Sequence, residues 1–231
     1  AAHELGLPIH IHMSETAAEV EQNVRDYGVR PAEHLDRVGV FTRPTLLAHA
    51  VHLTDEEIAL LAERGAAVSH NPVSNLKLAS GIARVPDLLQ AGVAVTLGTD
   101  SVASNNNLDL FEEIKLTAML HKGVTGDPTV LPAAQVLRMA TVDGARVLGM
   151  EDTGMLKEGW KADLIALRTD RTHFVPRTDF VSHAVYAACG ADVEHVWVNG
   201  RQLMRGRELL TLDEERIRHE VQQRFERLLR G

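Results

Sequence analysis

Residues 45–70 read TLLAHAVHLTDEEIALLAERGAAVSH, and this stretch decides the fold. It starts with a short apolar run, Thr45–Val51, which predicts a buried strand. The amphipathic segment Thr54–Arg64 predicts a helix, and the apolar run Ala66–His70 predicts a second strand. A strand, a helix and a strand in this order indicate a parallel sheet with helical crossovers.

The same alternation continues on both sides of this stretch. Two more strands and two more helices are predicted: Ile9–Met13, Val93–Leu97, Thr16–Tyr27 and Arg84–Gln90. Local signals mark the ends of the helices. Thr54 and Glu57 have the spacing of a capping box, and Gly65 and Gly92 stand at expected helix C-caps.

Each predicted strand ends in a polar cluster. The clusters are His12-Met13-Ser14-Glu15, His49-Ala50-Val51-His52, Ser69-His70-Asn71-Pro72 and Gly98-Thr99-Asp100-Ser101. The carboxyl ends of parallel strands carry the catalytic groups of (β/α)8 barrels, and four strands make half a barrel. A flat doubly wound sheet also fits the alternation. We favour the barrel because every strand delivers polar groups to one end, without a glycine-rich phosphate loop.

The pattern changes after the fourth strand. Further elements are expected as helices at Leu108–Lys122, Pro132–Met150, Phe180–Ala188 and Asp213–Leu229, and as strands at Lys161–Leu167, Val193–Val198 and Gln202–Met204. Asn199-Gly200 is a strong hairpin signal. We place a domain boundary near Glu151, so that residues 1–150 form the half barrel. Residues 151–231 then form the C-terminal part of a small β-sandwich with a terminal helix.

Composition limits the classes of function. With 45% hydrophobic and 24% charged residues, the 231-residue chain has the composition of a soluble globular protein. The sequence contains no apolar run of ~20 residues and no secretion-signal pattern at its start, so we expect a cytoplasmic protein without membrane contacts. The single Cys189 excludes an internal disulfide and a zinc site of paired cysteines. A net charge of −8 argues against a nucleic-acid partner and favours a small molecule.

The opening segment, Ala1–Pro8, has the pattern of the last turn of a helix that ends at Gly6. A complete domain rarely begins inside the end of a helix. We therefore expect this chain to be an incomplete sequence or a fragment. Half a barrel has unpaired strand edges, so residues 1–231 expressed alone should be oligomeric or aggregated.

The first polar cluster suits a metal site. His10 and His12 alternate with Ile9 and Ile11, so both imidazoles face the same side of the strand. Glu15 follows just past the strand end. A histidine at this position can coordinate a metal, and the carboxyl group can act as a proton donor outside the metal shell. For either histidine the alternative is a hydrogen-bonded core residue without a metal. The sequence favours this alternative more for His10 than for His12.

Asp100 follows the fourth apolar run. A carboxylate there can bind a metal and also accept the proton of an attacking water molecule. The alternative is that Asp100 caps the next helix. We expect the nearby Asn105, Asn106 and Asn107 to do that capping, which leaves Asp100 free for chemistry.

The other histidines at the strand ends differ in how strongly the sequence supports a role in the site. His49 ends a strand of small and apolar residues and could polarise an attacking hydroxide or complete a metal shell. His52 is expected to be a partly exposed structural residue. His70 stands beside a polar stretch, Asn71 to Asn75, which is expected to form a loop over the same end of the barrel.

These clusters together resemble a known family, the 5-methylthioadenosine/S-adenosylhomocysteine deaminases of the amidohydrolase superfamily. The resemblance rests on four motifs in order: IHMSET at 11–16, AHAVH at 48–52, SHNPVSNLKL at 69–78 and GTDSVASNN at 98–106. It extends to Gly154-Met155-Leu156, Gly159 and Ala162-Asp163-Leu164, which resemble the return of the chain into the family's β-sandwich. The similarity covers essentially the whole chain.

The resemblance implies a role for each site residue. His12 would be the metal ligand of strand five, and Asp100 the strand-eight metal ligand and general base. Glu15 would protonate a purine ring nitrogen, and His49 would orient the nucleophilic water. Glu15 and Asp100 would thereby also contact the substrate. The implied reaction converts an adenosine analogue to the inosine analogue and ammonia, with one divalent metal ion, zinc or iron, as cofactor.

One departure from the family pattern affects these roles. The family's first strand carries a His-x-His pair that supplies two more metal ligands. His10-Ile11-His12 has that spacing, but only three further strands lead to Asp100, whereas a first-strand pair would need seven. We therefore assign this strand as strand five and expect the chain alone to be poor in metal and inactive.

Other functions stay open at this point. A related aminohydrolase could act on guanine, cytosine or a triazine, because the loops that choose the substrate lie in the absent half. A non-catalytic structural fragment is the alternative outside enzymes, since two expected ligands are missing. For the complete protein we expect a nucleoside substrate and a homo-oligomer.

Overall fold

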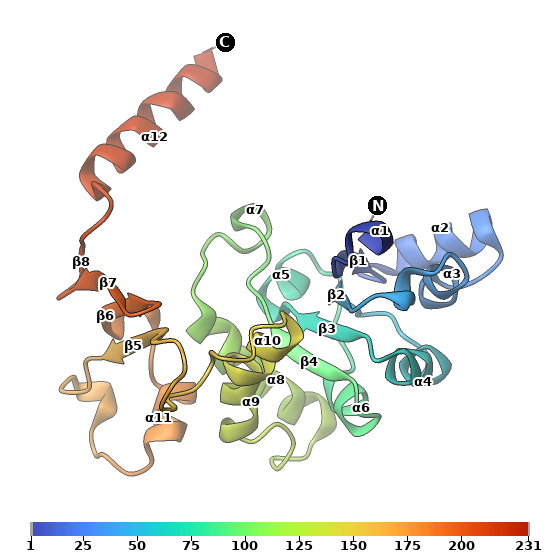
Figure 1. Cartoon of the computed structure of the whole chain (residues 1–231), viewed down its shortest axis with the longest axis horizontal. Helices are drawn as coiled ribbons and strands as arrows, with labels where there is room; N and C mark the ends of the chain where they lie inside the picture. The colour runs from blue at the N-terminus through green and yellow to red at the C-terminus, as the bar shows by residue number, and fades with distance from the viewer. Residues whose placement is uncertain (1, 231) are drawn as a thin grey trace.

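The computed structural model describes residues 2–230, so Ala1 and Gly231 lie outside the described part. It confirms the predicted α/β fold with a parallel sheet. The four strands pair in the order β1-β2-β3-β4 and are all parallel (Figure 1). Their bounds are β1 Ile9–Met13, β2 Thr45–His49, β3 Ala67–His70 and β4 Ala94–Leu97. His12 pairs with Ala48 and His70 with Leu97, so the carboxyl ends meet at one edge.

Helices connect these strands, as the sequence pattern predicts. They are α2 Ala17–Tyr27, α3 Pro31–Arg37, η1 Val40–Thr42, α4 Asp55–Arg64, α5 Pro72–Lys77 and α6 Val85–Gln90. The capping box is confirmed: the Thr54 hydroxyl accepts from the Glu57 amide, and the Glu57 carboxylate accepts from the Thr54 amide. The expected loop after β3 is wrong in part, because α5 begins at Pro72, a residue well suited to the first position of a helix.

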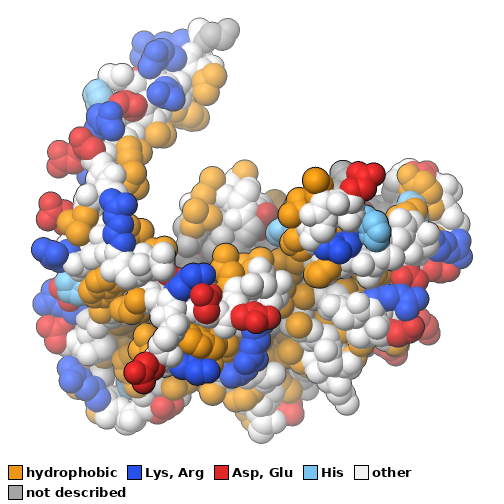
Figure 2. Space-filling model, in the orientation of Figure 1, with side chains coloured by type: hydrophobic (Ala, Val, Ile, Leu, Met, Phe, Trp, Pro, Cys, Tyr) orange, Lys and Arg blue, Asp and Glu red, His pale blue; other side chains and the backbone are white. Residues whose placement is uncertain are grey.

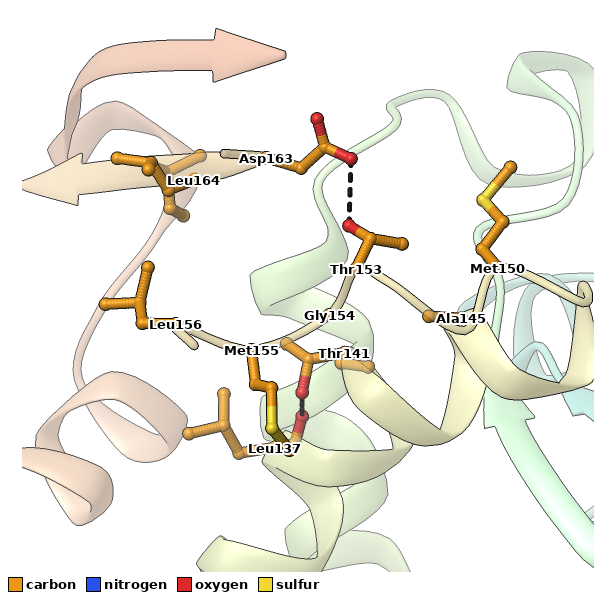
Figure 3. A pocket seen from close by; sticks show the side chains of 12 residues that line it. Leu137, Thr141, Ala145, Met150, Thr153, Gly154, Met155, Leu156, Asp163 and Leu164 are labelled. Atoms are coloured by element: carbon orange, nitrogen blue, oxygen red, sulfur yellow. Dashed lines mark hydrogen bonds between the residues drawn. The ribbon is translucent and has the colours of Figure 1, made fainter. Parts of the chain in front are cut away.

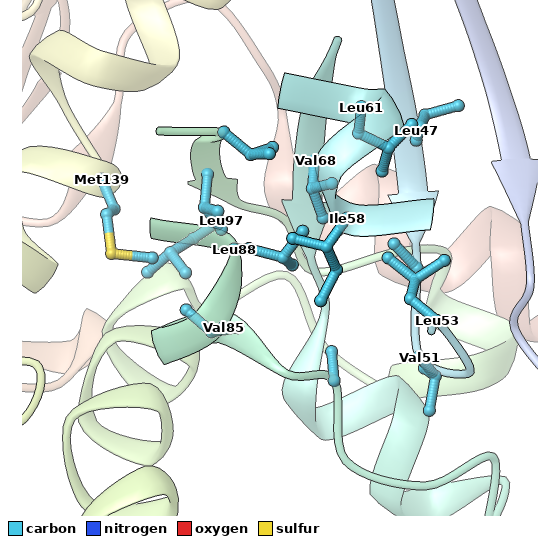
Figure 4. Packing of buried hydrophobic residues seen from close by; sticks show 14 of the residues in the cluster. Leu47, Val51, Leu53, Ile58, Leu61, Val68, Val85, Leu88, Leu97 and Met139 are labelled. Carbon is cyan, nitrogen blue, oxygen red and sulfur yellow. The ribbon is translucent and has the colours of Figure 1, made fainter. Parts of the chain in front are cut away.

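The core lies between the sheet and these helices (Figure 4). Leu47 and Val68 on the strands are fully buried and belong to one hydrophobic cluster with Leu61 and Leu88 on the helices. Full burial of such a side chain contributes about 1.5–3 kcal/mol. Met139 extends the cluster beyond β4. The core thus fixes the strands whose ends carry the polar clusters.

The helices that follow β4 differ from the prediction at one place. They are α7 Val102–Asn105, α8 Leu110–Thr125, α9 Ala133–Met139 and α10 Val142–Val147. The expected single helix Pro132–Met150 is wrong, because the backbone breaks at Thr141, where ψ is −100°. The break allows α10 to pack on β4: a Cβ on Gly144 would lie 2.8 Å from Oγ1 of Thr96, which also donates to the Met139 carbonyl.

A second, antiparallel sheet has the order β5-β6-β7-β8. Its elements and the short helices around them are β5 Leu164–Leu167, η2 Thr172–Phe174, α11 Phe180–Tyr186, η3 Gly190–Asp192, β6 Val193–Val198, β7 Arg201–Arg205 and β8 Glu208–Leu209. The hairpin prediction is confirmed, with φ of 49° at Asn199 and 77° at Gly200. Helix α11 packs against α8 and α9, and its Val185 joins the main core.

The two ends of the chain are helical. Helix α1 (Ala2–Leu5) ends at Gly6, which has φ of 68°, as the opening pattern predicts for the described part of that segment. The predicted terminal helix is α12 (Glu214–Arg230), which extends away from the rest of the molecule (Figure 1). No residue in 214–230 is buried, and hydrophobic side chains line one side of α12 (Figure 2). None of the helices in residues 2–230 is both long and apolar enough to cross a membrane.

Candidate active site at the strand ends

Three of the predicted site residues come together from separate strand ends. His12 lies on β1, His49 ends β2, and Asp100 follows β4. One ligand atom from each lies within 4.8 Å of the others, and in the described part of the chain this is the group that could hold a metal ion. The imidazole rings of His12 and His49 are stacked with centroids 5.2 Å apart. The fold therefore assembles two imidazole rings and a carboxylate.

The backbone is unusual where the chain leaves the strands. Ser14, His49 and Asp100 have φ of 51°, 75° and 59°, in the left-handed region that favours glycine. Each such non-glycine residue costs about 1–3 kcal/mol and persists only where its surroundings hold it. Hydrogen bonds to neighbouring side chains hold all three residues in these conformations.

His49 is held by one neighbour and has a free nitrogen. Its side chain is 1% exposed, and its Nδ1 lies 2.7 Å from Oδ1 of Asn75. Because that amide oxygen can only accept, Nδ1 is the donor in this contact, and Nε2 is the ring nitrogen that points to the site. Nε2 finds no hydrogen-bond partner among the described residues, and it lies 3.8 Å from Oε2 of Glu15 and 4.0 Å from Oδ2 of Asp100.

Asp100 is fixed by two serines. The hydroxyls of Ser74 and Ser104 donate to its Oδ2 at 2.7 and 2.6 Å. Burial acts to raise the pKa of Asp100, but the hydrogen bonds from Ser104 and Ser74 hold it below its ordinary value. The carboxylate is therefore ionised at neutral pH and available as a ligand or proton acceptor.

The expectation that asparagines cap the start of the next helix is wrong, although Asn106 stands at the C-cap of α7 with φ of 78°. Ser101 caps α7 by accepting from the Ala103 amide, and Asp109 caps α8 by accepting from the Phe111 amide. Asn105 is instead buried and donates to the Thr99 carbonyl, next to Asp100. The position of Asn105 is therefore set by its burial and by this hydrogen bond, and not by a capping role.

Glu15 lies at the edge of the site and is partly exposed. Its Oε1 accepts a 3.3 Å hydrogen bond from Ser80, and its Oε2 faces Nε2 of His49. The turn that presents it is closed by Glu19, whose carboxylate accepts from the amides of Ser14 and Glu15 at 2.8 and 2.7 Å. Glu15 thus stands beside the donor group and outside the three ligand atoms.

This arrangement of donors at the ends of parallel strands agrees with the comparison with known families. The model of the Amidohydrolase family matches residues 1–203. The chain belongs to the amidohydrolase family. It is 53% identical over 227 residues to a 5-methylthioadenosine/S-adenosylhomocysteine deaminase of Dictyoglomus thermophilum, covering 98% of this chain and 53% of that protein. It is 51% identical over 228 residues to a 5'-deoxyadenosine deaminase of Methanosarcina acetivorans, covering 99% and 52%.

A solved amidohydrolase structure extends the similarity to three dimensions. The crystal structure of an adenosine deaminase from Xanthomonas campestris with bound zinc is 40% identical and superposes with a TM-score of 0.96. The match covers 100% of this chain and 53% of that one. The chain thus spans about half the length of the relatives that it matches.

The other histidines considered from the sequence lie outside the donor group of this amidohydrolase chain. His10 is exposed on the same face of β1 as His12, as the strand alternation predicts. Nε2 of His52 lies 2.7 Å from the Ser80 carbonyl, which is a structural contact. His70 is fully buried against His121, with the two Nε2 atoms 3.3 Å apart. Burial lowers the pKa of His70 to about 3 and that of His121 to about 4, so both rings are neutral.

Sequence reasoning missed the residues that support the donor group. Ser74 and Asn75 lie in a stretch that was singled out only as a polar loop, and no role was assigned to Ser80 or Ser104. Glu113 gave no signal at all, because a glutamate in an amphipathic helix is ordinarily exposed. It is fully buried, and burial raises its pKa to about 7.

A groove away from the donor group lies between the two regions of the described chain (Figure 3). It has a volume of about 560 Å³ and runs between α9, α10 and β5, with mainly apolar residues such as Leu137, Met150 and Leu156 along it. Thr153 donates to Asp163 at 2.8 Å at its rim. Its lining contains no histidine, in contrast to the donor group at the strand ends.

Proposed function

We propose that the protein is a metal-dependent hydrolytic deaminase that converts an adenosine analogue, 5-methylthioadenosine or S-adenosylhomocysteine, to the inosine analogue and ammonia. The observation that carries this proposal is the meeting of His12, His49 and Asp100 within 4.8 Å. The names of the relatives at 51–53% identity supply the substrate class.

The proposal includes an assignment of the fold. Strands β1–β4 would be strands five to eight of a (β/α)8 barrel, with the half barrel in residues 1–150. Residues 151–231 would be part of a small β-sandwich with α12. Convergence of the polar groups at one end of the parallel strands supports this assignment, since barrel enzymes build their sites there.

The residues present fit a divalent metal ion. Nε2 of His49 is buried and has no hydrogen-bond partner among the described residues, as expected of a nitrogen that faces a metal position. Imidazole and carboxylate are donors that zinc and iron both accept. We propose His12 and Asp100 as ligands, with His49 completing the group or orienting water. When bound, the metal ion supplies Lewis-acid chemistry that lowers the pKa of a water molecule.

The side chains of this chain can move the protons that deamination requires. Asp100 is ionised and held at Oδ2 by two serines, so it can accept a proton from the attacking water. Glu15 stands outside the ligand atoms and, in its protonated form, can donate to a purine ring nitrogen. His49 can direct the water through its free Nε2.

These roles give a balanced hydrolysis. The water oxygen forms a bond to C6 of the adenine ring while the ring nitrogen takes a proton from Glu15. The C6–N bond to the amino group then breaks, and the nitrogen leaves as ammonia after receiving the proton held by Asp100. The proton that remains on the new C6 hydroxyl group returns to the Glu15 carboxylate, which restores the acid for the next cycle. Water is consumed, and the product is the 6-oxo purine.

Ammonia release tests the proposal. The protein expressed from its complete reading frame should release ammonia from 5-methylthioadenosine or S-adenosylhomocysteine and should hold about one divalent ion per chain. Adenosine, guanine, cytosine and a triazine serve as comparison substrates, and elemental analysis distinguishes zinc from iron. Activity only on guanine, cytosine or the triazine would contradict the proposed substrate, but the proposed hydrolytic mechanism would still hold. Absence of metal and of all activity would favour a structural role.

Assembly and location are further parts of the proposal. We propose a homo-oligomer for the complete protein, and for residues 1–231 alone an oligomeric or aggregated state that is nearly free of metal and inactive. Size-exclusion chromatography with metal analysis measures both. A monomer of residues 1–231 that keeps a full equivalent of metal and turns over substrate would make His10 and His12 a ligand pair. The cytoplasmic location stays a prediction.

A further inference from the structure

Glu113 is a fully buried carboxylate that contacts two segments of the active site. It lies in the first turn of α8 and is not one of the three residues of the donor group. Its Oε2 accepts from the Val73 amide at 3.2 Å, and its Oε1 accepts from Nδ2 of Asn105 at 2.6 Å. Nothing in the proposed reaction uses this side chain directly.

The first of these contacts holds the start of α5. Asn71, the residue before this helix, makes no side-chain capping bond. The Glu113 carboxylate, which belongs to α8, accepts from the free Val73 amide in its place. The two residues that follow Val73 both act on the donor group. Ser74 donates to Oδ2 of Asp100, and Asn75 accepts from Nδ1 of His49.

The second contact holds the segment on the other side of Asp100. Nδ2 of Asn105 donates both to Glu113 and to the Thr99 carbonyl, at 2.6 and 2.7 Å. Ser104, the preceding residue, donates to the same Oδ2 of Asp100 as Ser74 does. Glu113 therefore joins the two segments whose hydroxyls meet on one carboxylate oxygen.

We propose that Glu113 is a positioning residue for the active site: by binding α5 and α7 together it fixes the side chains of Asp100 and His49. This inference rests on the proposed function for its catalytic readout. Outer residues that orient metal ligands typically change metal affinity or activity by ~10–100-fold when they are replaced. Glutamine at position 113 keeps the volume but presents a donor where two acceptors are needed, so one of the two contacts is lost.

The test compares Glu113→Gln with Glu112→Gln in the protein expressed from its complete reading frame. Glu112 is the adjacent glutamate of the same turn, is exposed, and accepts only a surface hydrogen bond from Asn107. For Glu113→Gln we expect kcat to fall ~10–100-fold with KM within about twofold, and the visible spectrum of the cobalt-loaded protein to change. Glu112→Gln should match the wild type in both.

The spectrum separates positioning from a purely structural role. A residue needed only for stability would lower the amount of folded protein but leave the cobalt spectrum per bound ion and the kcat per bound ion unchanged. That outcome would overturn the proposal. If Glu113→Gln does not fold, Asn105→Ala takes its place, because it removes the Asn105 contacts to Glu113 and Thr99 and leaves the contact between Glu113 and Val73. An unchanged spectrum and kcat in that variant would equally overturn it.

Failure of the proposed function would give a different result. A wild-type protein that binds cobalt but deaminates none of the nucleosides would contradict the deaminase proposal alone. The cobalt spectra of the Glu113 and Glu112 variants would still decide the positioning role. A wild-type protein with no affinity for cobalt would overturn both.

Discussion

The parallel sheet and the C-terminal segments differ in how far their apolar side chains are buried from solvent. Strands β1–β4 bury one face under their own helices, with Leu47, Val68 and Leu88 fully enclosed. In contrast, β5 and β6 have no buried residue, and α12 leaves its apolar side chains exposed. The site lies in the region that encloses its own core. Positions that must hold a donor group to within tenths of an ångström need such support.

The two regions are nevertheless joined at defined points. The Gly190 amide donates to Oδ2 of Asp109, the cap of α8, and a Cβ on Gly190 would lie 2.9 Å from that oxygen. Val185 on α11 is buried in the main core. The comparison therefore predicts that changes near the strand ends affect chemistry, while changes at the far C-terminal end leave it intact.

The largest effect is expected at Glu15. Glu15→Gln removes the proposed proton donor, so turnover should fall ~10²–10⁴-fold while the bound metal is retained. The measurements are steady-state kinetics and metal analysis of the protein expressed from its complete reading frame. Glu21→Gln, an exposed glutamate of α2, is the control. Loss of the metal together with activity would place Glu15 in the metal shell.

Two histidines on one strand provide the next test. His12→Ala removes a proposed ligand, so metal affinity should fall by more than the ~100-fold typical of outer residues. His10→Ala removes another exposed imidazole from the same face of β1 and should leave affinity unchanged. Competition with a chromophoric chelator measures both. Equal losses in the two variants would mean that His10 is also a ligand.

Stability should separate the two regions most simply. Leu88 is 0% exposed in the core and Leu228 on α12 is 80% exposed. Leu88→Ala should lower the free energy of unfolding by ~2–5 kcal/mol, because it leaves a cavity. Leu228→Ala should change it by less than ~0.5 kcal/mol. Urea unfolding gives both values, and a large loss from Leu228→Ala would reveal a contact of α12 in solution.

A smaller effect should appear in the pH dependence of stability. His70 and His121 have ordinary values near 6.5 when unfolded and folded pKa values of about 3 and about 4. Below pH 6.5 the unfolded state binds protons that the folded state excludes. Each histidine should therefore lower the free energy of unfolding by about 1.4 kcal/mol per pH unit as the pH falls toward its folded pKa.

One variant from each region tests whether the buried histidines cause this pH dependence of the free energy of unfolding. His121→Gln should make the decrease between pH 6 and 5 less steep, whereas His219→Gln should not, because His219 is exposed on α12. Urea unfolding at both pH values is the measurement. An unchanged slope in His121→Gln would show that the folded protein accepts a proton on this pair.

Much of the fold follows from local signals in the sequence. The alternation of apolar runs and amphipathic segments was enough for the parallel sheet, and Asn199-Gly200 was enough for the hairpin. The break at Thr141 was not predictable, because it depends on the close approach of Gly144 to Thr96 on a distant strand. Such contacts exist only once the chain is folded.

The candidate site shows the same division. His12, His49 and Asp100 could be selected because each ends an apolar run, and the fold then brings their ligand atoms within 4.8 Å. The residues that hold them lie on other elements. Nothing in the periodicity of α8 indicates that Glu113 is buried beneath the Asp100 segment, so supporting contacts of this kind require coordinates.

The left-handed backbone at His49 and Asp100 sets a limit for protein engineering. Glycine adopts this conformation without strain, so replacing Asp100, which is only partly buried, relieves a local cost while it removes the donor. At His49 the cavity left by the buried ring offsets that gain. A library selected for heat resistance alone should therefore tolerate glycine at position 100 and lose catalysis. Directed evolution of this chain needs a simultaneous selection for turnover, because thermal fitness and chemistry favour opposite residues where the strands end.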